Sequence, residues 1–156
     1  MFNKSQFGRS MIEMLGVLAI IGVLSVGGLA GYSKAMRANK VNNAIDYFRR
    51  AQMSYIERMA TNNLAGFVDG TIQCNNLLGE ALPSGVRMCK CLTSPKRIYV
   101  RFNTVPLLKE FANRISGEAG NADMMTRIDT ALNNGTSVTE MSIHWQPGTG
   151  KWYNDR

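Results

Sequence analysis

The sequence Gly8-Arg9-Ser10-Met11-Ile12-Glu13-Met14 opens the apolar segment around which the rest of the chain is interpreted. The eighteen residues from Met14 to Gly31 carry no charge, and Ser25 is the only hydroxyl among them. As a helix they would span about 27 Å, close to the hydrocarbon thickness of a bilayer. One carboxylate, Glu13, lies at the start of this segment. An acid beside a membrane segment is costly without a partner, so Glu13 is interpreted first as functional.

The length and net charge of the chain limit the classes of protein to which it can belong. Its 156 residues favour one domain of ordinary size in addition to the N-terminal segment. A net charge of +7 makes nucleic acid or acidic lipid a partner to consider. The densest basic cluster follows the apolar segment directly, where contact with lipid headgroups explains it equally well. Its members are Lys34, Arg37, Lys40, Arg49 and Arg50.

Helical periodicity continues past the apolar segment. Mostly apolar residues recur at spacings of three and four, and no proline appears before Pro83. The pattern predicts one continuous helix from about Ser10 to Ala60, whose second half packs on a folded domain. The inward positions expected in that half are Val41, Ile45, Phe48, Gln52, Tyr55 and Met59.

The remaining chain predicts short helices and strands. Residues 62–96 are the least regular part, with a short helix near 74–82. Alternation predicts strands at 97–103 and 139–145, and a short last strand at 151–153. Pro106 opens an amphipathic helix, residues 117–120 break it, and a second helix runs from about 122 to 133 before Asn134-Gly135. The predicted class is α+β, with the long N-terminal helix packed on a small antiparallel sheet and extra short helices.

Three cysteines, Cys74, Cys89 and Cys91, lie in the irregular region. Cys89 and Cys91 are too close in sequence to pair with each other, so either one is a candidate partner for Cys74. The closed loop would have a sequence separation of fifteen or seventeen residues, and closing it contributes roughly 3 kcal/mol in the chain-entropy model. The third thiol is then free or intermolecular. A zinc site lacks a convincing fourth ligand, so a disulfide is favoured over a metal.

Motifs for catalysis are weak. Gly148-Thr149-Gly150-Lys151 resembles the end of a phosphate loop, but Trp145 and Trp152 occupy the positions that need Gly and Ser or Thr. His144, the single histidine, is expected at the surface on the side of Glu140 and Ser142 and has no nucleophile to pair with. The chain is therefore predicted not to be an enzyme and to have no cofactor.

Two cleavage sites compete in the N-terminal segment. A secretory signal would be cut after the apolar run, where Gly28-Leu29-Ala30 offers small residues, although Glu13 is then misplaced. The alternative cut, after Gly8, resembles the processing of the type IV pilin and pseudopilin family. That family has a short basic leader ending in Gly, and an acid at the fifth mature position of an apolar helix. Counting Arg9 as first, Glu13 is fifth, and the similarity covers about residues 4–32.

The resemblance implies a division into a cleaved leader (1–8), a transmembrane and polymerisation helix (9–32), its amphipathic continuation (33–60) and a globular α+β head (61–156). A prepilin peptidase would cut between Gly8 and Arg9 and methylate the new amino terminus, where the family usually has Phe or Met. Glu13 would then pair with the terminal ammonium of a neighbouring subunit. The expected location is the inner membrane, as a single-pass protein, before assembly, and a periplasmic or extracellular filament afterwards.

The resulting hypothesis is a structural subunit of a type IV pilus-like or type II secretion-like filament. Its expected partners are like subunits, the peptidase, inner-membrane assembly machinery and, before assembly, lipid. Two alternatives stay open. The net charge of +7 favours a DNA-binding pilin of an uptake system, with nucleic acid as a less favoured partner. The secretory cut would instead release a Sec-exported periplasmic domain that begins near Gly31.

Overall fold

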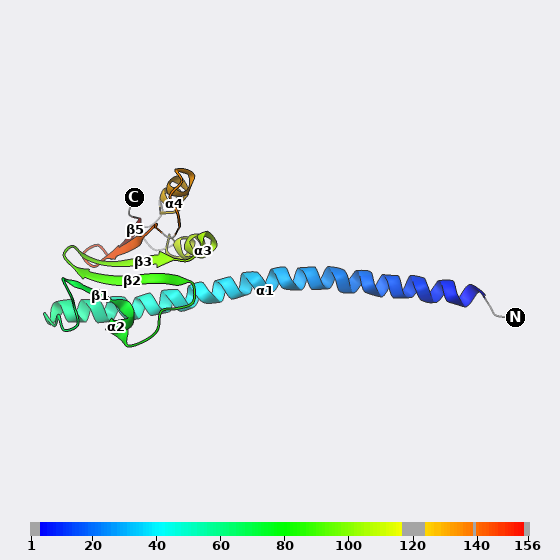
Figure 1. The fold of residues 1–156 in the computed structure, drawn as a ribbon, viewed down its shortest axis with the longest axis horizontal. Coiled ribbons are helices and arrows are strands. Elements are labelled where there is room, and N and C mark those ends of the chain that lie inside the picture. The colour runs from blue at the N-terminus through cyan, green and yellow to red at the C-terminus, as the bar shows by residue number, and fades with distance from the viewer. Residues whose placement is uncertain (1–3, 117–123, 139, 155–156) are drawn as a thin grey trace. The chain divides into compact units, whose positions relative to one another are not determined.

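A computed structural model describes residues 4–116, 124–138 and 140–154 (Figure 1). The chain divides into two compact units, Met1–Arg37 and Ala38–Arg156. Helix α1, Lys4–Ala60, is unbroken and contributes to both. The predicted continuous helix is therefore confirmed, but it starts at Lys4 rather than near Ser10. The residues from Lys4 to Arg9, which precede the predicted start, extend the helix that follows them.

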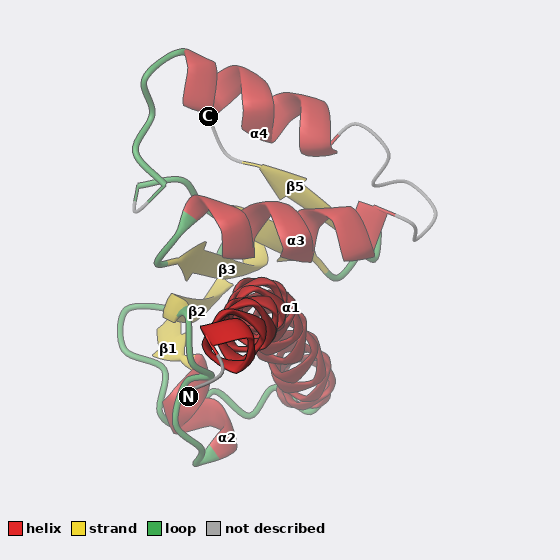
Figure 2. Cartoon of the chain, turned by 90° about the vertical axis from the view of Figure 1, so that its right-hand side faces the viewer, coloured by secondary structure: helices red, strands yellow, loops and turns green. Residues whose placement is uncertain are grey.

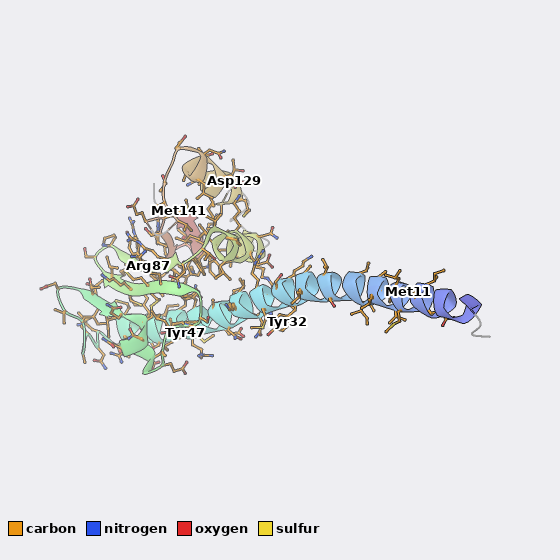
Figure 3. The ribbon with its side chains drawn as sticks, turned by 45° about the vertical axis from the view of Figure 1, so that its right-hand side comes forward. Met11, Tyr32, Tyr47, Arg87, Asp129 and Met141 are labelled. Carbon is orange, nitrogen blue, oxygen red and sulfur yellow. A yellow bond between two sulfur atoms is a disulfide. The ribbon has the colours of Figure 1, made fainter. Side chains whose placement is uncertain are left out.

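Within the first unit, the apolar side chains of α1 from Met11 onward are exposed. Met11 and Tyr32 stand out from the helix with exposed fractions of 70% and 66% (Figure 3). By length and composition this helix is able to cross a membrane.

The second unit contains a five-stranded antiparallel sheet in which every strand pairs with its neighbour in sequence. The strands are β1 (Thr71–Gln73), β2 (Val86–Thr93), β3 (Lys96–Phe102), β4 (Ile143–Gln146) and β5 (Lys151–Asn154). The predicted α+β class, with a long helix packed on a small antiparallel sheet, is confirmed. Strands β3 and β5 match their predictions closely. The predicted strand at 139–145 is shorter at its start, because β4 begins at Ile143, and Thr139 lies outside the described residues.

Strands β1 and β2 were not predicted. Residues 62–96 were expected to be largely irregular, and this expectation is wrong for these two segments. A β-bulge between Val86 and Met88 shifts the register against β3, so the alternation of buried and exposed residues is interrupted. The three residues of β1 are too few to show a pattern.

Helix α1 contributes its second half to the core on one face of the sheet. Of the six predicted inward positions, Val41, Phe48 and Tyr55 are buried, while Ile45, Gln52 and Met59 are only partly buried. Ala44 and Ala51, together with Tyr47, are buried in their place. The buried face of α1 is therefore rotated from the line of the six predicted residues. The small alanine side chains on this face let the backbone of α1 lie close to the sheet.

Phe48 lies in the aromatic centre of this core. Its ring lies 5.6 Å from Phe111, 6.2 Å from Trp152 and 6.4 Å from Phe102, measured between ring centroids. These partners come from a helix and two strands that are distant in sequence. Edge-to-face packing of this kind adds to the stabilisation from apolar burial.

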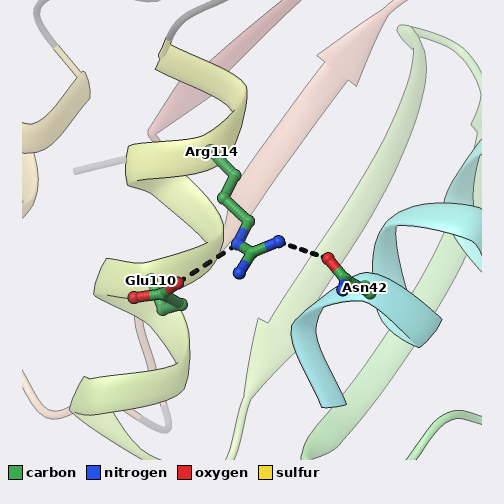
Figure 4. Close-up of polar contacts among 3 residues, drawn as sticks. All are labelled: Asn42, Glu110 and Arg114. Atoms are coloured by element: carbon green, nitrogen blue, oxygen red, sulfur yellow. Dashed lines mark hydrogen bonds and ion pairs between the residues drawn. The ribbon is translucent and has the colours of Figure 1, made fainter. Parts of the chain in front are cut away.

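Three shorter helices complete the second unit: α2 (Cys74–Leu78), α3 (Val105–Ser116) and α4 (Met124–Asn133). All the predicted inward residues of α3 are buried, namely Leu107, Leu108, Phe111, Ala112 and Ile115. Helices α1 and α3 lie on the same side of the sheet (Figure 2). Arg114 of α3 connects them, since it bonds Glu110 and also donates to Asn42 of α1 (Figure 4).

Helix α4 ends as predicted at Asn134-Gly135. Gly135 has a φ of 83°, and the amides of Gly135 and Thr136 donate to the carbonyls of Leu132 and Ala131. This is the glycine-dependent termination that the sequence indicated. The predicted break at 117–120 and the predicted start near Ala122 lie outside the described residues.

Candidate functional site

The predicted processing and assembly residues lie close together on α1. The Gly8–Arg9 peptide bond lies within the helix, but the side chain of Arg9 is outside the described part of the chain. Glu13 follows one turn later and is exposed. The structure thus places the carboxylate on the same helix as the proposed cut, and immediately before the uncharged segment.

Large apolar side chains cover the segment that follows Glu13. Their exposed fractions range from 53% for Ile21 to 74% for Val23. A continuous apolar surface of this size is unfavourable in water and marks a site for lipid or protein contact. In either environment the low dielectric strengthens the attraction of Glu13 for a cation. The segment can therefore act both as an anchor and as an interface with one charge-specific contact.

The structure shows which of Cys89 and Cys91 pairs with Cys74, a choice that the sequence left open. Cys74 forms a disulfide with Cys89, with 5.3 Å between their Cα atoms, and Cys91 is a buried thiol. The Sγ of Cys91 nevertheless lies 3.7 Å from the Sγ of Cys74. Cys89 and Cys91 are two residues apart on β2, so both side chains face the first residue of α2.

The environment of Cys91 makes its thiol unreactive. Burial raises the pKa of this thiol to about 12, so it stays protonated at neutral pH. Burial also raises the pKa of Tyr47 and Tyr55 on the adjoining face of α1 to about 12. Tyr55 donates a hydrogen bond to the carbonyl of Leu92, the residue that follows Cys91. These contacts tie α1 to β2 and give the cluster a structural role.

Replacing Cys89 with serine should move the disulfide to Cys91, because the two sulfurs of Cys74 and Cys91 already lie in contact. When the variant is refolded with oxidised glutathione, so that the thiols react before Cys91 is buried, non-reducing peptide mapping should recover a Cys74–Cys91 bond. Most of the roughly 3 kcal/mol that such a cross-link contributes should be retained, whereas Cys74→Ser should lose it. The control Cys91→Ser should keep the Cys74–Cys89 bond. Two unoxidised thiols in the folded Cys89→Ser variant would contradict this expectation.

His144 differs from its prediction. Its side chain is only 7% exposed, so the expected surface position is wrong. Its ring lies between those of Tyr99 on β3 and Tyr153 on β5, at centroid distances of 5.5 Å and 5.4 Å. These two tyrosines on the neighbouring strands bury the imidazole. Only the order and register of the strands identify them as neighbours of His144. Among the described residues, no group of three His, Cys, Asp or Glu side chains is arranged to hold a metal ion.

A hollow of about 220 Å³ lies on the second unit between α1, α3 and the β4–β5 hairpin. Its lining is largely apolar and includes Phe48, Phe111 and Trp152, and α1 also contributes the polar Arg49 and Gln52. This lining holds neither a nucleophile nor a carboxylate, so it offers shape and apolar contact rather than acid–base chemistry. Comparisons with protein-family models, curated proteins and solved structures found no match to this chain.

Proposed function

We propose that the chain is a structural subunit of a filament of the type IV pilus or type II secretion kind, with a structural rather than a catalytic role. The observation that carries the proposal is the continuity of α1. The first half exposes an uncharged apolar surface that begins directly after Glu13. The second half contributes buried side chains to the core of a folded head. A secretory signal needs no such continuity, since it would be removed at the end of the apolar segment.

The proposed mechanism begins in the membrane. The apolar half of α1 holds the chain in the inner membrane, with which its length and composition are compatible. A prepilin peptidase cuts after Gly8 and creates an amino terminus on Arg9, the site of methylation. The helix then leaves lipid for the centre of a filament of like subunits, aided by inner-membrane assembly machinery. The mature location is a periplasmic or extracellular filament.

Glu13 directs this transfer. Within a helical bundle its carboxylate pairs with the terminal ammonium of a neighbouring subunit. The pair offsets part of the free energy needed to bury each charge, while an unpaired charge in the bundle is strongly unfavourable. Subunits are therefore added where a partner charge is present.

The intact mass of the mature protein tests the proposal. The full chain is expressed with a prepilin peptidase, and the expected product lacks Met1 to Gly8 and begins at Arg9. Gly8→Asn should remain uncut, whereas Ala30→Leu, which removes a small residue that signal peptidase needs, should be processed normally. Loss of about thirty residues would identify a secretory signal instead. That result, or an unprocessed chain, would overturn the proposal.

A further inference from the structure

The five strands of the sheet carry a charge imbalance. Their sequences contain six Lys or Arg residues and no Asp or Glu. The chain as a whole has a net charge of +7 from 18 basic and 11 acidic residues. The excess positive charge is therefore concentrated on the sheet, while the acids of the described residues lie on helices and loops. The six residues are Arg87, Lys90, Lys96, Arg97, Arg101 and Lys151.

Three of these cations lie on one face of β2 and β3. Ile98, Val100 and Phe102 of β3 are buried in the core, so the alternating residues Arg97, Tyr99 and Arg101 point to the opposite face. On β2, Lys90 pairs directly with Tyr99 and lies on that same face. We call this the basic face, defined by Lys90, Arg97, Tyr99 and Arg101. Arg87 lies on the same strand as Lys90, at the bulge, and is exposed (Figure 3).

The basic face has donors that the rest of the chain does not use. In the described part of the chain, no hydrogen bond or ion pair joins Lys90 or Arg101 to another side chain. The Nε of Arg101 is buried and lacks an acceptor there. Arg97 donates through Nη1 to the Tyr99 hydroxyl at 3.2 Å, which orients both groups on the face. An external anion at the Lys90 ammonium or the Arg101 guanidinium would gain charge-assisted hydrogen bonds.

The spacing of the cations fits a linear polyanion. Residues on one face of a strand repeat about every 6.6 Å along the strand. Because Lys90 lies opposite Tyr99, the cations Arg97, Lys90 and Arg101 follow one another at this step along the strand direction. Successive phosphates of an extended nucleic-acid strand have a comparable repeat. We infer that the basic face binds the phosphate backbone of nucleic acid, independently of the proposed filament function.

A lipid surface is the other anionic partner that this chemistry could serve. Faces that dock on membranes also present exposed apolar side chains for insertion. Met88 and Leu92, the apolar neighbours of these cations, are instead half-buried. The basic cluster after the apolar segment, which includes Lys34 and Arg37, is exposed and better suited to headgroups. The sheet is therefore assigned to nucleic acid.

The test measures binding of a fluorescent single-stranded oligonucleotide of about 20 nucleotides to the full chain in a neutral detergent. The double variant Lys90→Gln/Arg101→Gln should bind about tenfold more weakly at low salt, because two phosphate contacts are lost. The magnitude of the slope of log affinity against log salt concentration should fall by about 1.4 for the same reason. The matched control Lys34→Gln/Arg37→Gln removes the same net charge and should bind like the unmodified chain.

Folding and partner class are checked separately. Tryptophan fluorescence should show that the double variant keeps its core, and Lys90→Gln alone should lower the magnitude of the salt slope by about 0.7. No binding at low salt, or equal loss in the two double variants, would overturn the assignment. Binding of anionic vesicles, but not of the oligonucleotide, that depends on Lys90 and Arg101 would also overturn it. None of these measurements requires filaments, so the inference can fail while the filament proposal stands.

Discussion

Replacing Phe48 with alanine is expected to destabilise the folded head by about 3–5 kcal/mol. The side chain is 1% exposed and packs against Phe102, Phe111 and Trp152, which come from three separate elements. Its removal leaves a cavity between α1, the sheet and α3, which these elements close only in part. A loss of this size is a large fraction of the stability of an ordinary domain.

Denaturant unfolding followed by tryptophan fluorescence measures this loss. Both tryptophans of the chain, Trp145 and Trp152, are buried in the second unit, so the signal reports the head even when α1 is held in detergent. Met53→Ala is the matched control, because Met53 lies on the same helix but is 72% exposed. It should change stability by less than about 0.5 kcal/mol. Equal effects of the two substitutions would show that α1 does not carry the core.

Replacing Glu13 with glutamine is expected to leave membrane insertion intact and to reduce incorporation into filaments at least tenfold. The substitution keeps the shape of the side chain but removes the charge that pairs with the neighbouring terminal ammonium. An ammonium buried without its partner costs about 3–5 kcal/mol, which is more than a tenfold effect requires. Insertion should persist because the apolar segment from Met14 to Gly31 is unchanged.

The measurement compares filament yield with membrane content. Sheared filaments and washed membranes are quantified from the same cells by immunoblotting. Glu57→Gln removes an identical charge from an exposed position of the same helix and should assemble normally. Normal filament yield from the Glu13 variant would remove the charge-pairing mechanism, and loss of the variant from membranes would assign Glu13 to insertion instead.

The long helix and the later strands were predictable because their patterns are local. Uninterrupted apolar residues and spacings of three and four extend through α1, and alternation at Ile98, Val100 and Phe102 marks β3 clearly. Strand β2 lacked such a signal. Its bulge at Val86 and Met88 shifts the alternation, and its buried positions include cysteines, which were considered as cross-links rather than as core residues.

The residues that needed tertiary information were those whose partners are distant in sequence. Cys89 and Cys91 are equivalent by spacing, and only the placement of α2 against β2 distinguishes them. His144 is polar and alternates with Ile143 and Trp145, so the sequence predicts an exposed position, and only pairing with β3 and β5 buries it. The basic face was hidden for the same reason, since Lys90 and Arg101 become neighbours only through the β2–β3 register.

The order of the sheet also governs the sequence of events during synthesis. Strands β1 to β5 lie side by side in the order in which the ribosome makes them, so each new strand finds its edge already present. Pairing of β2 with β3 and of β4 with β5 closes short loops and favours rapid folding, whereas β3 waits for β4 until α3 and α4 have been made. Helix α1 is made first, and Phe48 is not fully covered until α3 and β5 supply its partners Phe111 and Trp152. During that interval the nascent chain exposes apolar surface on both halves of one helix, and a holding chaperone or the membrane would have to shield it.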